Sequence, residues 1–68
     1  MDYATMQQIL EQANDNVGFA LWEMKYQAKG HCLVLYEGNK IIARGRTAVI
    51  NAVSEIYVNY AVLGGKPL

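Results

Sequence analysis

The sequence has few of the residues that stabilise very small proteins through covalent or metal cross-links. Its 68 residues include one cysteine, Cys32, one histidine, His31, and one proline, Pro67. A single cysteine excludes an internal disulfide framework and is typical of a reducing compartment. The sequence also has no cluster of cysteine and histidine of the kind that holds a structural metal. We therefore expect a chain without disulfides, metal or cofactor.

Long apolar runs, targeting segments and common catalytic motifs are missing as well. No apolar run approaches the roughly 20 residues that span a membrane. The first residues, MDYATMQQ, do not have the basic and apolar segments of a signal peptide. The sequence also contains no phosphate-binding glycine loop, dinucleotide fingerprint or nucleophile elbow. These absences predict a cytoplasmic protein, not bound to a membrane, that is not an enzyme.

The formal net charge is zero, but the charges are unevenly distributed. Residues 1–24 contain four acidic side chains and no lysine or arginine, whereas residues 25–46 contain five basic side chains and one acidic one. The middle of the chain is therefore locally basic. It is much less basic than a typical nucleic-acid-binding domain.

A chain of this length forms a single domain, residues 1–68, with a small core. It buries only about 60% of the surface that its unfolded form exposes, so its stability is marginal. Oligomerisation is the supplement that remains when disulfides and metals are absent, and 53% hydrophobic residues provide material for it. We therefore expect association with a second protein surface.

The residue pattern predicts two helices and three strands. Residues 2–15 have the period of an amphipathic helix, with Asp2 as the N-cap or Thr5 with Gln8 as a second capping option. Its expected buried face consists of Met6, Ile9, Leu10 and Ala13.

Residues 17–27 alternate like a strand, although their good helix formers leave a helix through Glu23 open. Residues 31–37 and 40–46 read as a hairpin joined by Gly38-Asn39, a dipeptide favoured in tight turns.

The last helix is expected over residues 48–63, with Thr47 as its N-cap and Gly64-Gly65 after its end. It carries more apolar residues than one sheet face needs to cover. We interpret the surplus as an association surface, because large exposed apolar patches are rare on monomers. The alternatives are deeper burial of the helix, or a C-terminal part that is a strand, given its β-branched and tyrosine residues. The expected interface residues are Tyr57, Val58, Ala61 and Val62.

These elements predict an α+β fold of order α-β-β-β-α. It is a two-layer sandwich of a three-stranded antiparallel sheet with two helices on one face. From about residue 5 to residue 62 the pattern resembles the double-stranded RNA-binding domain. Residues 5–13 are similar to that family's first helix, "KGH" (29–31) to the loop before its second strand, and residues 33–47 to its central hairpin. The resemblance implies this fold and binding to duplex RNA.

The sequence departs from that family where its second helix begins. The family places a lysine cluster there that grips phosphates, whereas residues 47–51 read Thr-Ala-Val-Ile-Asn. Basic residues remain nearby, and Lys40, Arg44 and Arg46, which we call the basic corner, alternate as if they shared one face or edge of a strand. The candidate nucleic-acid-binding residues are Lys29, His31, Lys40, Arg44 and Arg46. The alternative is that these charges only protect a strand edge from aggregation.

Two further readings concern His31 and the aromatic residues. His31, at the start of a strand, makes the chain similar to small ribonuclease toxins of two-gene toxin–antitoxin modules, which use a strand histidine. Cys32 should point to the opposite face and be buried. Trp22 and Tyr26, near Lys25, are candidates either for stacking on bases or for the core and interfaces.

The sequence therefore predicts a small non-enzymatic protein-interaction module. It is expected to be of accessory or inhibitor type, such as phages and mobile elements encode, and to self-associate through residues 48–63. The alternatives are weak nucleic-acid binding through the basic corner and, more remotely, a ribonuclease activity that uses His31.

Overall fold

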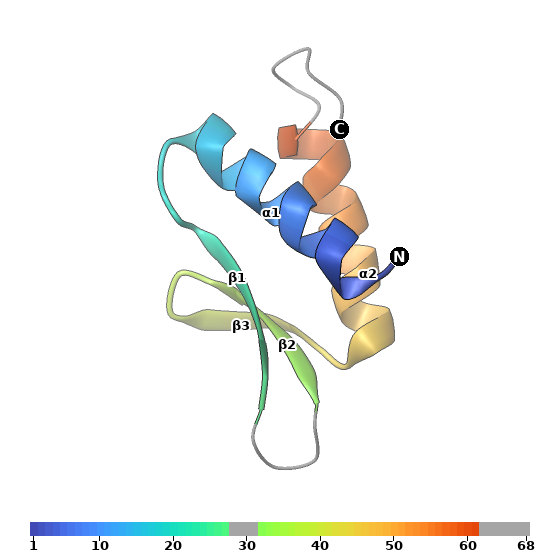
Figure 1. Cartoon of the computed structure of the whole chain (residues 1–68). Coiled ribbons are helices and arrows are strands. Elements are labelled where there is room, and N and C mark those ends of the chain that lie inside the picture. Colours follow the sequence, from blue (N-terminus) through green and yellow to red (C-terminus); the bar gives the residue numbers. More distant parts are fainter. Residues whose placement is uncertain (28–31, 62–68) are drawn as a thin grey trace.

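The computed structural model describes residues 1–27 and 32–61 and has the expected order of elements (Figure 1). Helix α1 (Tyr3–Val17) precedes strands β1 (Trp22–Tyr26), β2 (Leu33–Glu37) and β3 (Lys40–Arg44). Helix α2 (Arg46–Ile56) continues into a single π-helical segment, η1 (Tyr57–Ala61). The three strands form one antiparallel sheet in the order β1-β2-β3. The predicted α+β layout is therefore confirmed.

Helix α1 begins and ends as its sequence predicts. Asp2 is the N-cap, and its Oδ1 accepts a hydrogen bond of 2.8 Å from the backbone N–H of Thr5. At the other end Gly18 adopts φ 95°, the left-handed conformation that glycine takes most easily at a helix C-terminus. The four predicted core positions, Met6, Ile9, Leu10 and Ala13, are all buried.

The first strand is shorter than expected. Val17 belongs to α1, residues 18–21 connect the two elements, and β1 starts only at Trp22. The alternative of a helix through Glu23 is wrong, because Trp22–Tyr26 pairs with β2 along its full length. The predicted hairpin is confirmed, with Gly38 at φ 63° in the turn between β2 and β3.

A β-bulge in β3 overturns the expected placement of the basic corner. Leu35 pairs with Ala43 and Tyr36 pairs with Ile41, so Ile42 is an extra residue without a partner on β2. Because of this extra residue, the side chains of β3 before the bulge and those after it no longer alternate between the two sheet faces in the same phase. Lys40 and Arg44 therefore point to opposite faces of the sheet, and the prediction that they share a face is wrong. The alternative that they share an edge is not contradicted, because β3 is an edge strand.

The last helical region also differs from expectation. It begins at Arg46, not at Ala48, and its N-cap is Gly45 at φ 92°, with no side-chain hydrogen bond; Thr47 is not a cap. It is not one continuous α-helix either, because the chain changes to π-helical geometry at Tyr57. The predicted end at Gly64-Gly65 lies outside the described residues.

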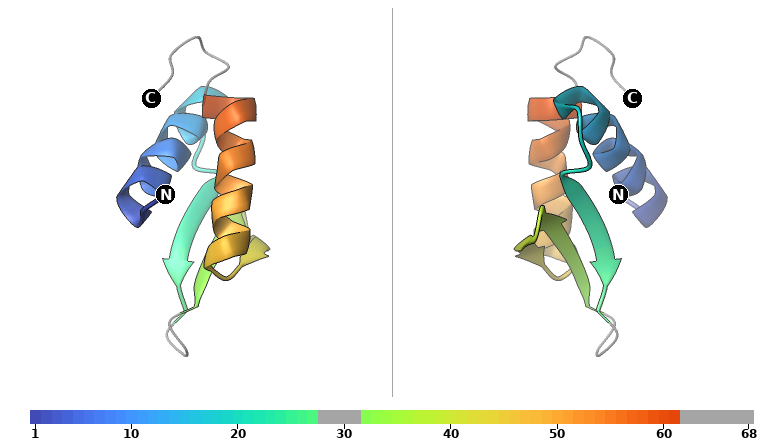
Figure 2. Two further views of the ribbon diagram at one scale, coloured as in Figure 1. Left: turned by 90° about the vertical axis from the view of Figure 1, so that its right-hand side faces the viewer. Right: turned by 90° about the vertical axis from the view of Figure 1, so that its left-hand side faces the viewer.

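Both helices lie on one face of the sheet, and the core lies between the two layers (Figures 1 and 2). Helices α1 and η1 pack against each other at one end, whereas α2 covers β2 and β3. The opposite, outer face of the sheet is not covered by either helix. The buried hydrophobic residues that form the core are Met6, Ile9, Leu10, Ala13, Trp22, Met24, Leu33, Leu35, Ala43, Val49, Val53, Ile56 and Ala61.

Candidate interaction surfaces

The residues of the basic corner do not converge on one site. Arg44 donates from its guanidinium to Oε1 of Gln27, at the end of β1 (3.1 Å). Arg46 donates to the backbone oxygen of Met1, next to the N-terminus of α1 (3.1 Å). Lys40 lies beside the hairpin turn on the other side of the bulge. All three side chains are exposed, but they reach toward different parts of the chain.

The other two candidate nucleic-acid-binding residues, Lys29 and His31, lie outside the described residues. The reading of His31 as a ribonuclease residue therefore stays a prediction. Cys32 is half-buried rather than buried, and its thiol lies 3.7 Å from the carbonyl oxygen of Leu33. In residues 1–27 and 32–61 no three side chains of His, Cys, Asp or Glu are grouped so that they could hold a metal ion.

The outer face of the sheet carries a small cationic and aromatic cluster. Lys25 and Arg44 flank Val34 on its two neighbouring strands, and Val34 is 0% exposed although it points away from the core. The Lys25 Nζ lies 5.3 Å from the centre of the Tyr36 ring, a cation–π distance. The sequence suggested Trp22 as an aromatic residue near Lys25, but Trp22 is buried on the inner face. The aromatic ring that contacts Lys25 is therefore that of Tyr36.

The predicted association surface on the last helix is smaller than expected. Ala61 is 0% exposed and lies in the core, so it cannot contribute to an interface. Tyr57 is partly buried against the core, and Val62 lies outside the described residues. Val58, in contrast, is 66% exposed, and Tyr60 is 38% exposed. Much of the apolar surplus is thus explained by packing of η1 on α1, with Val58 and Tyr60, the η1 surface, left exposed.

An open groove of about 280 Å³, with both polar and apolar lining residues, adjoins the η1 surface. The Trp22 and Tyr60 rings form one wall with centres 4.8 Å apart, and Nε1 of Trp22 donates to Oε1 of Glu37 (3.1 Å). The groove is lined by Trp22, Glu37, Ile42, Ala52, Glu55, Ile56, Asn59 and Tyr60. Ile42, the bulge residue, is 39% exposed there. The bulge therefore adds an apolar side chain to this groove, which the sequence pattern did not predict.

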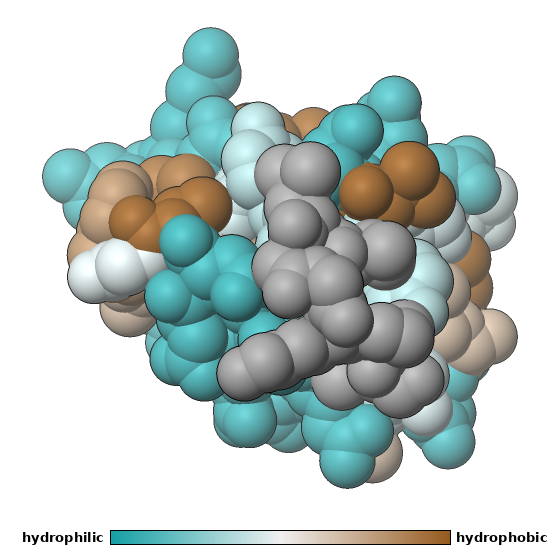
Figure 3. All heavy atoms as spheres, turned by 90° about the horizontal axis from the view of Figure 1, so that it is seen from above, coloured by the Kyte–Doolittle hydropathy of each residue, from teal (hydrophilic) through white to brown (hydrophobic). Residues whose placement is uncertain are grey.

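Apolar side chains are also exposed away from η1. Phe19, in the connection between α1 and β1, is 61% exposed. Seen from above, hydrophobic residues lie in separate patches, with hydrophilic residues between them, in the part of this face that is not grey (Figure 3). On this face the exposed apolar area is thus divided among separate patches.

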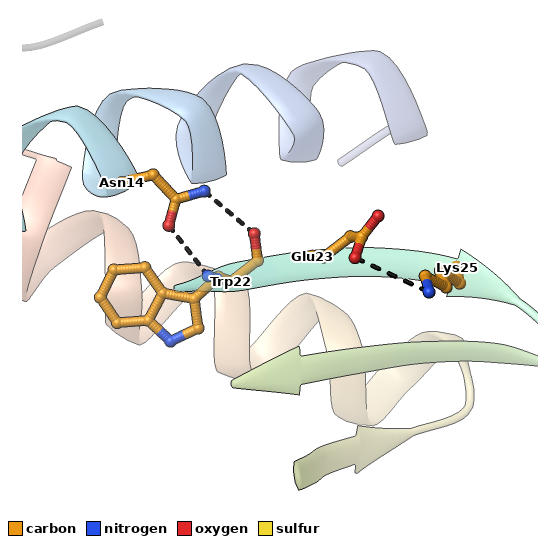
Figure 4. A network of polar contacts seen from close by, with 4 residues as sticks. All are labelled: Asn14, Trp22, Glu23 and Lys25. Atoms are coloured by element: carbon orange, nitrogen blue, oxygen red, sulfur yellow. Dashed lines mark hydrogen bonds and ion pairs between the residues drawn. The ribbon is translucent and has the colours of Figure 1, made fainter. Parts of the chain in front are cut away.

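A second groove, of about 300 Å³, lies between α1 and β1. We call it the α1–β1 groove. Asn14 closes one end of it, because its side-chain amide is bonded to the backbone of Trp22 (Figure 4). At the other end Tyr3 stacks on Tyr26, with ring centres 5.6 Å apart. The sequence had shown no sign of this groove, because it depends on where α1 crosses β1.

No family model, curated protein or solved structure matches this chain at a significant level. The resemblance to the double-stranded RNA-binding domain therefore stays a prediction beyond the order of elements. No helix in the described part of the chain is long and apolar enough to cross a membrane.

Proposed function

We propose that this chain is a small non-enzymatic protein-interaction module of accessory or inhibitor type, which associates with a second copy of itself through the η1 surface. The observation that carries the proposal is the 66% exposure of Val58 beside the partly exposed Tyr60 ring. An exposed β-branched side chain beside an aromatic one is suited to the dry centre of an interface.

The stability of so short a chain also supports association. The described residues contain one ion pair, between exposed Lys25 and Glu23 at 3.7 Å, and such surface pairs contribute little. Cys32, the sole cysteine, is not part of a disulfide. Burial of the η1 surface in a dimer would add apolar area to a core that is small for an independent domain.

Substitution of Val58 by glutamate tests the proposal. Because this side chain is exposed in the isolated chain, Val58→Glu should leave the fold intact and weaken the dimer. Phe19→Glu is the matched control, since Phe19 is similarly exposed (61%) but lies away from η1. We expect sedimentation to show a weakened dimer for Val58→Glu alone. Equal association of both variants would refute the role of η1.

Weak nucleic-acid binding is the second candidate, and the exposure of Arg44 and Arg46 is the observation that favours it. A labelled RNA duplex of about 20 base pairs, longer than the roughly 16 that a double-stranded RNA-binding domain spans, would detect it at low salt. The remote ribonuclease alternative requires that the parent chain cleave RNA and that His31→Ala abolish the cleavage. Absence of cleavage by the parent chain would exclude it.

A further inference from the structure

The hydrogen-bond pattern of β1 shows which of its backbone groups face away from the sheet. Gly38 N–H donates to the Leu21 carbonyl, and Gln27 N–H donates to the Cys32 carbonyl. In an antiparallel ladder the residues that bond to a given neighbour alternate along the strand. Odd-numbered residues of β1 therefore face β2, and the even-numbered ones direct their N–H and C=O groups to the outer edge.

Asn14 occupies the first of these outward positions. Its Oδ1 accepts from Trp22 N–H (2.9 Å), and its Nδ2 donates to the Trp22 carbonyl (3.0 Å) (Figure 4). The side-chain amide thus satisfies the groups that a neighbouring strand would otherwise bind. For the outward groups of Met24 and Tyr26, the described residues provide no such partner. Two positions of the β1 edge are therefore ready to pair with an extended segment.

Helix α1 lies over this open edge of the sheet. In Figure 2 α1 lies outward of β1, beyond the edge of the sheet, so the α1–β1 groove runs alongside the strand. Its volume of about 300 Å³ is open to solvent. The residues that line it are Tyr3, Gln7, Leu10, Glu11, Asn14, Trp22, Glu23 and Met24. An added strand would therefore find backbone partners on β1 and side-chain partners on α1.

The charge of the groove selects the kind of segment that fits. Glu11 and Glu23 are its charged lining residues, and none of the eight is basic. Glu23 is partly neutralised by Lys25, whereas Glu11 has no ion pair within the described residues. A lysine- or arginine-bearing segment therefore complements the groove.

We infer that the β1 edge binds an extended, basic peptide segment of a partner protein, which pairs with Met24 and Tyr26 as a fourth strand beneath α1. Strand addition of this kind takes its affinity from main-chain hydrogen bonds and its specificity from alternate side chains. This inference does not rest on association through η1. A second copy of the chain fits the edge poorly. If its β1 paired antiparallel with β1 about Met24, its own α1 would have to occupy the space beside the edge that α1 already covers.

The test uses the full chain with a synthetic peptide of alternating lysine and valine. Trp22, the only tryptophan, lines the groove and reports binding by its fluorescence. Amide hydrogen exchange then locates the peptide. We expect slower exchange at Met24 and Tyr26, and little change at Glu23 and Lys25, whose amides already face β2. A peptide with alternating backbone N-methyl groups should not bind, because it cannot pair as a strand.

Charge reversal provides a matched pair of variants. Glu11→Lys should weaken binding of the lysine–valine peptide by about fivefold. Asp15→Lys makes the same change on the same helix outside the groove lining, and it should alter the affinity by less than about twofold. Equal losses in both variants would mean non-specific attraction and would overturn the proposal.

Three further results would also overturn it: unchanged exchange at Met24 with the peptide bound, equal affinity for a glutamate–valine peptide, or protection of Met24 that rises with protein concentration alone. The last result would assign the edge to a second copy. Loss of association in Val58→Glu with retained peptide binding would separate this site from the η1 surface.

Discussion

The side chain of Asn14 pairs with both backbone polar groups of Trp22, accepting from its N–H at 2.9 Å and donating to its carbonyl at 3.0 Å. The same Oδ1 also accepts from the N–H of Leu21 at 2.9 Å. One amide thus joins the last turn of α1 to the start of β1 and fixes the position of the helix over the edge of the sheet. It also leaves Met24 as the first outward position that another strand can reach.

Replacement of Asn14 by alanine should therefore destabilise the chain. The variant leaves the N–H and the carbonyl of Trp22 without their partner, whereas the N–H of Leu21 still donates to the carbonyl of Phe19, and this loss costs roughly 1–3 kcal/mol. Asn51→Ala is the control, because Asn51 is exposed in α2 and the change has the same effect on helix propensity. We expect it to change the free energy of unfolding by less than about 0.5 kcal/mol. Urea denaturation of both variants would measure the difference, and equal midpoints would contradict the role given to Asn14.

Two glycines should respond differently to the same substitution. Gly45 has φ 92° and ψ 154°, a region that is essentially restricted to glycine, so Gly45→Asn should cost roughly 1–3 kcal/mol. Gly38 has φ 63°, which asparagine adopts readily, so Gly38→Asn should cost less than about 0.5 kcal/mol. A Cβ at either position has open space, so the difference would report backbone strain alone. Thermal unfolding of the two variants is the measurement; similar losses would argue against the assigned conformations.

The N-cap of α1 predicts a pH dependence. The hydrogen bond from Thr5 lowers the pKa of Asp2 below its usual value. Because the folded-state pKa is the lower one, the stabilisation is present above the ordinary pKa of about 3.9 and is lost as the pH falls through the folded-state pKa. Asp2→Asn keeps a capping oxygen without the charge. Its stability relative to the parent chain should rise as the pH is lowered through this range, as followed by helical circular dichroism.

Asp15→Asn provides the control for that experiment, since it removes an exposed carboxylate from the same helix without a capping hydrogen bond. If both variants shifted in the same way with pH, the effect would belong to the overall charge and not to the cap.

The nucleic-acid alternative makes a quantitative prediction about salt. If Arg44 and Arg46 contact phosphates, the double variant Arg44→Ala/Arg46→Ala should reduce the dependence of log affinity on log salt by about one unit per lost contact. The Arg44 side chain reaches toward Gln27 and the Arg46 side chain toward Met1. Simultaneous contact of both with the phosphates of one duplex is therefore hard to achieve. A titration of the duplex at several salt concentrations measures the slope. An unchanged slope would refute binding through these residues.

The sequence predicted the parts of the fold that local chemistry determines. The Asp2 cap, the buried stripe of α1 and the Gly38 turn follow from short-range preferences, and all three were confirmed. The bulge was not predictable, because Ile41 and Ile42 are adjacent and either one satisfies an alternating pattern. Without the bulge, Lys40 and Arg44 were expected on one face of the sheet, and this expectation was therefore wrong.

The interaction surfaces were harder to predict because they depend on tertiary packing. Ala61 reads as part of an apolar helix surface, but contact between η1 and α1 buries it. Asn14 reads as a helix-ending residue, and its bonds to Trp22 exist only after α1 has folded back on β1. The sequence did predict Val58 as an interface residue, and its exposure in the structure keeps that prediction open to test.

The most direct test of the central proposal is the molar mass of the parent chain in solution over a wide concentration range, measured by light scattering after size-exclusion chromatography. Association through the η1 surface predicts a mass that rises from one chain toward two as the concentration increases. A mass of one chain at every concentration would contradict self-association and leave the chain as a monomeric binding module.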